Sequence, residues 1–101
     1  MSPKIEILMR EKVLPIMKGY KIDYVAVFGS YARGEETAKS DLDLLVNFSK
    51  PVTYFDILEM EDKIAKKIKI SKVDLVTINA LHPYIKKYVE KDLIIIHDSR
   101  R

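Results

Sequence analysis

Residues 29–46 read GSYARGEETAKSDLDLLV, and a fold alone does not require this stretch. It places a Gly-Ser pair after an apolar run, then a short polar segment, then two aspartates inside a second apolar run. Residues two apart in a β-strand project from the same face, so Asp41 and Asp43 would point the same way, about 7 Å apart along the backbone. Two carboxylates directed at one place predict a site for a divalent cation.

The segments next to this stretch predict two neighbouring strands and a loop. Residues 23–28 (DYVAVF) are β-branched and aromatic and end at a glycine, which predicts a buried strand. Residues 31–33 are expected to form a short helical turn and residues 34–40 a polar loop. Residues 41–48 (DLDLLVNF) predict the second strand. The connection is too short for a crossover helix, so we expect a mixed sheet.

Helical patterns flank these strands. Apolar residues recur at spacings of three and four over residues 4–18, which predicts an amphipathic helix that Pro15 bends or shortens. Residues 54–68 form a strongly amphipathic pattern whose acidic start and basic end suit the helix dipole. A last helix is expected from residue 79 or 80 to residue 91.

Two further strands complete the pattern. Residues 72–78 (KVDLVTI) predict a strand that carries Asp74 among apolar neighbours, and residues 93–97 (LIIIH) predict a last short strand. The length predicts one domain, residues 1–101. The order of elements indicates an α/β or α+β class, with helices flanking a small mixed sheet.

Composition excludes several classes of site. The chain has no cysteine, so disulfides and thiolate metal sites are excluded. No apolar run approaches the roughly 20 residues of a membrane helix, and charges near the N-terminus argue against a signal peptide, so we expect a cytoplasmic protein without membrane contact. The net charge of +3 suits an anionic ligand such as a nucleotide, although interspersed charges usually mean a solvated surface. The sequence carries no RNA-binding aromatic signature, so direct nucleic-acid binding is not expected.

Each aspartate also has a structural interpretation. A carboxylate within a strand is costly to bury unless a cation or hydrogen bonds satisfy it. Asp41 could instead begin the strand as an ordinary loop cap, and Asp74 could pair with a lysine such as Lys72. The Gly-Ser pair by itself is common in turns that end strands.

A resemblance connects these residues. Gly29 and Ser30, then ten residues, then Asp41-Leu42-Asp43 reproduce the GS-x10-DxD signature of the nucleotidyltransferases related to DNA polymerase beta. GSYARG followed by SDLDLLV, and later VDLVT with a helix containing PYI, resembles the minimal nucleotidyltransferase (MNT) antitoxins encoded beside HEPN-domain toxins. The resemblance extends from about residue 23 to the C-terminus.

The resemblance implies a polymerase beta-like nucleotidyltransferase fold and a set of site residues. Carboxylates suit Mg²⁺, and two such ions can clamp the attacking and leaving oxygens of a phosphoryl displacement. The implied cofactor is therefore Mg²⁺, as two ions, with ATP as substrate. The implied catalytic and metal-binding residues are Asp41, Asp43 and Asp74, and the implied nucleotide-binding residues are Gly29, Ser30 and Arg33.

The resemblance also implies a reaction and a partner. The expected reaction moves AMP from ATP to a tyrosine hydroxyl of a HEPN toxin, with release of pyrophosphate, and silences that toxin. A chain of 101 residues leaves little room for an acceptor pocket, which favours a macromolecular acceptor. Two alternatives stay open: an antitoxin that only binds and occludes its partner, and a nucleotidyltransferase that acts on a small molecule.

Structural roles account for the remaining polar and aromatic candidates. His82 and His97 lie on separate elements without metal-ligand spacing, which favours surface or helix-start roles. Tyr84 and Tyr88 lie four apart on the last predicted helix, and we expect them to pack rather than to stack on a base.

Overall fold

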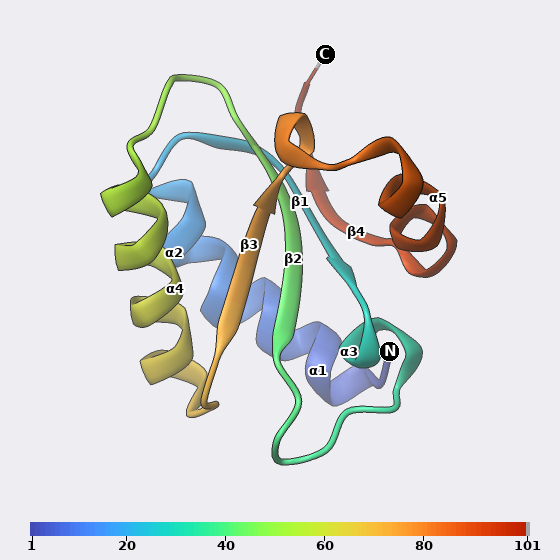
Figure 1. The fold of residues 1–101 in the computed structure, drawn as a ribbon. Coiled ribbons are helices and arrows are strands. Elements are labelled where there is room, and N and C mark those ends of the chain that lie inside the picture. The colour runs from blue at the N-terminus through green and yellow to red at the C-terminus, as the bar shows by residue number, and fades with distance from the viewer. Residues whose placement is uncertain (101) are drawn as a thin grey trace.

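A four-stranded mixed sheet forms the centre of the fold in the computed structural model, which describes residues 1–100. The strand order is β3-β2-β1-β4 (Figure 1). The strands are β1 Ile22–Phe28, β2 Leu42–Phe48, β3 Val73–Thr77 and β4 Ile94–Asp98. β1 runs antiparallel to both β2 and β4, whereas β2 and β3 are parallel. The predicted mixed sheet with flanking helices is therefore confirmed.

The N-terminal helical segment covers one face of this sheet together with a long helix (Figure 1). Its parts are α1 Pro3–Leu8, η1 Met9–Val13 and α2 Leu14–Lys18, and the long helix is α4 Tyr54–Ile68. The larger apolar core lies between these helices and the inward residues of the strands. Its fully buried members include Met17, Leu44, Met60 and Ile64.

The N-terminal segment accommodates Pro15 without a break. η1 is a π-helical turn, in which the Leu14 N–H donates to the carbonyl of Met9, five residues earlier. Proline has no N–H to donate and its ring crowds the preceding turn, so a wider turn before it relieves the conflict. The helical path therefore continues to Lys18 instead of being shortened at the proline.

The α4 helix follows its predicted bounds. A capping box starts it, because the Thr53 side chain accepts from the Asp56 N–H while the Asp56 carboxylate accepts from the Thr53 N–H. Lys69 ends it with a left-handed backbone, at φ 58°. The prediction for residues 54–68 is confirmed at both ends.

The opposite face of the sheet is covered by the single helix α5, Pro83–Asp92. Val89 is the one residue of α5 that is buried, against Tyr24, Ala26 and Leu45. α5 leaves much of this face uncovered by helices (Figure 1). The site described below lies on the same face.

Two predictions for the last helix were wrong. It begins at Pro83 rather than at residue 79 or 80, because η2 Ile78–Ala80 precedes it and His82 caps it, with Nδ1 accepting from the Tyr84 N–H. Tyr84 and Tyr88 do not pack in the core: they are 82% and 76% exposed. The expected helix-start role of His82 is confirmed.

Strand ends differ from the predictions by one residue. β2 begins at Leu42, so Asp41 precedes the strand instead of lying in it. β3 is one residue shorter at each end than residues 72–78, and β4 begins and ends one residue later than residues 93–97. In the part of the chain that the structure describes, no helix is long and apolar enough to cross a membrane.

Candidate active site

Asp43 and Asp74 lie side by side on the open face of the sheet. They are partners in the parallel register of β2 and β3. Leu42 and Leu44 on β2 belong to the core beneath the opposite face, and side chains alternate along a strand. The register therefore directs both carboxylates to the face that carries α5, about 5 Å apart at the backbone, as neighbouring strands are spaced.

Gly29 lies directly against the Asp43 carboxylate. β1 ends at Phe28, which is the antiparallel partner of Asp43, and Gly29 continues at φ 75° and ψ −153°. A Cβ on Gly29 would come within 2.6 Å of Asp43 Oδ2. Only glycine adopts that backbone conformation without strain, so this position is restricted both by the backbone and by the carboxylate.

Gly29→Ala is expected to destabilise the protein by about 1–3 kcal/mol and to displace the Asp43 side chain. Gly34→Ala is the matched control, because Gly34 also has a positive φ, 73°, but a Cβ added there would meet nothing within 4 Å. Gly34→Ala should cost about 1–2 kcal/mol without moving a carboxylate. Chemical denaturation of both variants, with the titration of the Asp43 carboxyl group followed by NMR, checks the prediction. An Asp43 titration that is unchanged in Gly29→Ala would show that the Gly29 contact does not position Asp43.

Ser30 opens a single turn of helix, α3 Ser30–Arg33, immediately after this glycine. Gly34 closes the turn with a left-handed backbone, and its N–H donates to the carbonyl of Tyr31. The short helical turn expected between the first two strands is thus confirmed. It holds Ser30 one residue away from the backbone that contacts Asp43.

The surroundings of the Asp43 carboxyl group disfavour its negative charge. Burial raises its pKa above the usual value for aspartate, and the negative charges of Asp74 and Asp41 raise it further. The positive charges of Lys72 and Arg33 oppose this shift without cancelling it. A cation placed beside Asp43 would favour its charged form and relieve this cost.

The raised pKa of Asp43 predicts a pH-dependent stability difference between the wild type and Asp43→Asn. Below the pKa of the unfolded chain, about 3.9, the aspartate is neutral in both states and resembles asparagine. As the pH rises from the unfolded-state pKa through the raised folded-state pKa, Asp43 ionises less readily in the folded protein than in the unfolded chain, and the wild type loses stability. Asparagine does not ionise, so Asp43→Asn becomes the more stable protein toward neutral pH. Thermal unfolding of both proteins from about pH 3 to pH 7 should show the gap opening with pH. A gap that closes instead would contradict the shift.

Lys72 supplies the positive charge closest to this group of carboxylates. Its Nζ lies 3.9 Å from Asp41 Oδ2 and 3.6 Å from Asp74 Oδ1. The pairing of Asp74 with Lys72, considered above as a structural alternative, is present. All three side chains are about 40% exposed or more, so these contacts are loose and screened by solvent. They leave Asp74 free to exchange the lysine for another cation.

Arg33 is held by α5. Its Nη1 donates to Asp92 Oδ2 at 2.8 Å, and its Nε lies 3.5 Å from Glu35 Oε2. The pair joins α3 to the end of α5 and so positions the helix beside the carboxylates. The role of Arg33 in nucleotide binding stays a prediction. In that role, the guanidinium would bind a phosphate group either together with Asp92 or after releasing Asp92.

A cavity of about 330 Å³ opens beside Asp43 and Asp74. Its other walls are mainly apolar and come from β1, the segment after η2, and α5; they include Phe28, Leu81, Ile85 and Val89. The sequence pattern did not assign these wall residues, because their meeting depends on where α5 crosses the sheet. The cavity lets a substrate group approach both carboxylates from an apolar side.

The carboxylates fit a metal ion that arrives with its nucleotide. Within residues 1–100, no three acidic or histidine side chains converge closely enough to enclose an ion by themselves. Mg²⁺ usually binds through one or two carboxylates, with substrate phosphates and water completing its shell. Asp43 and Asp74, which are paired in register, provide such a partial donor set.

A mixed sheet that carries paired carboxylates beside a Gly-Ser turn defines the nucleotidyltransferase class. The family model described as Polymerase beta, Nucleotidyltransferase matches residues 11–101. The chain belongs to this family.

Relatives and solved structures agree with this assignment. A candidate protein adenylyltransferase of Methanocaldococcus jannaschii is 39% identical over 92% of this chain and 95% of its own length. A solved structure of a candidate minimal nucleotidyltransferase is 33% identical, with a TM-score of 0.77 over 93% of this chain and 95% of that one. A complex of a tri-AMPylated HEPN toxin of Shewanella oneidensis with an MNT antitoxin matches with a TM-score of 0.72 over 94% of this chain and 74% of that one. At 20% identity, that last likeness concerns the fold alone.

Proposed function

We propose that this nucleotidyltransferase moves AMP from ATP to a tyrosine hydroxyl of a HEPN-domain toxin and thereby acts as its antitoxin. The reaction would need Mg²⁺, as two ions, and would take place in the cytoplasm, where ATP and Mg²⁺ are available. The observation that carries the proposal is the pairing of Asp43 with Asp74 in register, beneath the Gly29-Ser30 turn. The name of the Methanocaldococcus jannaschii relative, a candidate protein adenylyltransferase, supports a protein as the acceptor. The solved complex of a HEPN toxin with an MNT antitoxin is alike in fold, and it suggests the class of that protein.

Asp41, Asp43 and Asp74 would bind the Mg²⁺ ions, and Gly29, Ser30 and Arg33 would bind the triphosphate. When bound, Mg²⁺ supplies positive charge to the phosphate oxygens. Gly29 brings the backbone close without a side chain, and Ser30 offers a hydroxyl and an N–H to a phosphate oxygen. These roles follow from residue chemistry and from the placement of the turn directly beside Asp43.

Asp74 would accept the proton of the attacking hydroxyl. The hydroxyl oxygen forms a bond to the α-phosphorus while the bond from that phosphorus to the bridging oxygen breaks, and pyrophosphate leaves with that electron pair. The product is a phosphodiester between AMP and the acceptor side chain, and the proton passes from Asp74 to solvent. Asp74 suits this task because it is 39% exposed on the open face, at the edge of the apolar cavity.

AMP transfer is tested with the purified protein, ATP, Mg²⁺ and a HEPN-domain protein as the candidate acceptor. Intact-mass spectrometry of the HEPN protein should show additions of whole AMP groups, and peptide mapping should place them on tyrosine. Omission of Mg²⁺, or chelation with excess EDTA, should abolish the additions. The additions should also fail to appear when the nucleotide is ADP, because no pyrophosphate can leave.

Neutralisation of the toxin in cells separates catalysis from simple occlusion. If Asp43→Asn binds the HEPN protein but fails to neutralise it, AMP transfer and not binding is what neutralises the toxin. If the variant neutralises as well as the wild type while transferring nothing, the protein works by binding and the proposed reaction is wrong. Transfer onto a small molecule, with none onto protein, would also contradict the proposed acceptor.

A further inference from the structure

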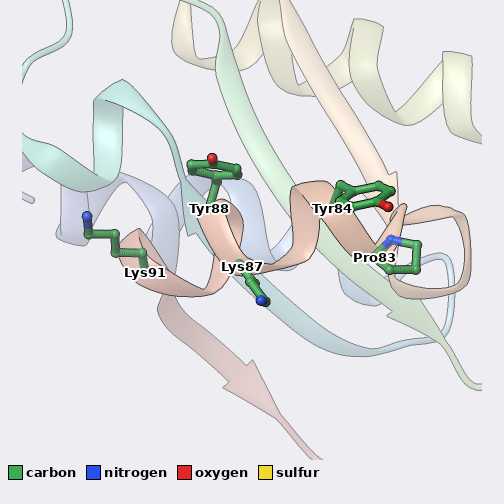
Figure 2. A pocket seen from close by; sticks show the side chains of 5 residues that line it. All are labelled: Pro83, Tyr84, Lys87, Tyr88 and Lys91. Carbon is green, nitrogen blue, oxygen red and sulfur yellow. The ribbon is translucent and has the colours of Figure 1, made fainter.

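The outer face of α5 carries a stripe of exposed tyrosines and lysines that the site does not use. Tyr84 and Tyr88 lie four residues apart, as do Lys87 and Lys91, and each tyrosine is followed three residues later by one of the lysines. Figure 2 shows Tyr84 and Tyr88 on the same side of the helix, one turn apart, with Lys87 pointing to the other side and Lys91 lying beyond Tyr88 toward the end of the helix. Together with Pro83 they line an open hollow of about 720 Å³.

This hollow is larger than the cavity beside the carboxylates, but no carboxylate lines it. Its lining residues therefore offer aromatic surface and positive charge but no carboxylate for metal-ion chemistry. Tyr84 and Tyr88 are 82% and 76% exposed. Exposed tyrosines are enriched where proteins bind one another, because each offers a large rigid surface and a hydroxyl at low cost in conformational entropy.

The charge of the stripe is not neutralised. On the neighbouring side of α5, Lys86 pairs with Glu90 at 3.7 Å. Among the residues that the structure describes, neither Lys87 nor Lys91 has an ion-pair partner. On α4, Lys63 and Lys66 each pair with an acidic residue one turn earlier, whereas Lys67, like the two stripe lysines, has no ion-pair partner among the described residues. The α5 stripe thus presents two unpaired positive charges around two aromatic rings.

The stripe is continuous with the candidate active site. Ile85, which is 54% exposed, lies next to Tyr84 on α5 and also lines the cavity beside Asp43 and Asp74. A molecule bound along α5 therefore reaches the carboxylates across a single exposed apolar residue. This continuity identifies the occupant as the molecule that brings the acceptor hydroxyl.

We propose that the Tyr84–Lys87–Tyr88–Lys91 face of α5 docks an acidic surface of the acceptor protein and so delivers its hydroxyl to the carboxylates. The inference rests on the proposed function for the identity of the acceptor. A polynucleotide fits this face less well, because two lysines are too few to follow a phosphate backbone. In addition, one side of the Tyr84 ring is already stacked on His82, at 5.3 Å between ring centroids.

The test compares two double variants with the wild type, using the HEPN-domain protein as the probe. Lys87→Glu/Lys91→Glu and Tyr84→Ala/Tyr88→Ala should each raise the Kd for this protein, and the KM for it in AMP transfer, by about tenfold or more. The KM for ATP and the kcat at saturating acceptor should stay within about twofold, because none of the four replaced residues lines the cavity beside Asp43 and Asp74. Increasing salt should weaken wild-type binding but hardly affect the lysine variant.

Lys12→Glu/Lys67→Glu is the matched control. It makes the same change in charge on exposed helical residues that lie away from α5, on elements covering the other face of the sheet. It should bind and modify the acceptor like the wild type. The thermal unfolding temperature of every variant shows whether the fold is kept, and the exposed tyrosines can be replaced without opening the core.

The outcomes separate this inference from the proposed function. A wild type that binds the HEPN protein but transfers no AMP would contradict the proposed reaction, while the binding comparison would still decide the docking face. Double variants that bind and transfer like the wild type would overturn the docking inference alone. Absence of wild-type binding to the HEPN protein would also overturn the docking inference. The same holds if the stripe is found to join two copies of this chain, or to bind RNA, while substitutions in it leave acceptor binding unchanged.

Discussion

Asp43→Asn should lower AMP transfer by about 10³-fold or more while leaving the protein folded. Asp43 is the carboxylate with the most demanding environment: it is paired in register with Asp74, it lies against Gly29, and its pKa is raised by burial and by like charges. Asparagine keeps the shape but removes the charge that would hold a cation. Because the charge is costly in the free protein, its removal should preserve or increase the thermal unfolding temperature.

The rate is measured in single turnovers, with intact mass as the readout and saturating ATP, Mg²⁺ and acceptor protein. Asp62→Asn is a suitable control, since Asp62 is an exposed partner of Lys66 on α4, away from the site. Asp41→Asn should fall between the two, because Asp41 precedes β2 and is 40% exposed. Full activity in a folded Asp43→Asn protein would exclude the carboxylate pair as the reaction centre.

The sequence predicted those parts of the fold whose signals are local. Residues 54–68 combine an apolar stripe with an acidic start and a basic end, so periodicity and charge mark the same helix. The short connection between the first two strands predicted a mixed sheet, and the structure pairs these two strands antiparallel. The π-turn of Met9–Val13 left no such signal, since apolar spacings of three and four persist through it.

The α5 helix shows where pattern reasoning fails. Its sequence offers two apolar stripes, one with Ile85 and Val89 and one with Tyr84 and Tyr88, and periodicity does not decide which of them faces the sheet. The structure buries Val89 and leaves both tyrosines outside. The choice follows from the start of the helix at Pro83 and from its crossing over the sheet, and both are tertiary features.

The candidate site divides in a similar way. The spacing of Gly29, Ser30, Asp41 and Asp43 is local, so it could be recognised in the sequence, and Asp74 followed from its place in an apolar strand. The pairing of Asp43 with Asp74, and the contact of Asp43 with Gly29, required the strand order and register. The Arg33–Asp92 ion pair joins residues 59 positions apart, and no pattern in the sequence predicted it.

The second large effect concerns Asp74. Asp74→Asn should lower kcat for AMP transfer at neutral pH by about 10²–10⁴-fold, the usual contribution of a general base, and the deficit should shrink as the pH rises. A tyrosine hydroxyl ionises on its own near pH 10, so an acceptor that is already deprotonated needs no base. The rate of the variant should therefore gain about tenfold for each pH unit between about pH 7 and pH 9, while the wild type changes little.

Asp43→Asn is the control for this pH dependence, because the two carboxylates lie side by side but have different expected tasks. Loss of cation binding at Asp43 is not repaired by ionising the acceptor, so the Asp43→Asn deficit should stay constant over the same pH range. Single-turnover rates of the three proteins, with circular dichroism at each pH to verify folding, make the comparison. If the Asp74→Asn deficit is also independent of pH, Asp74 does not take the proton, and its task is confined to holding cation and substrate.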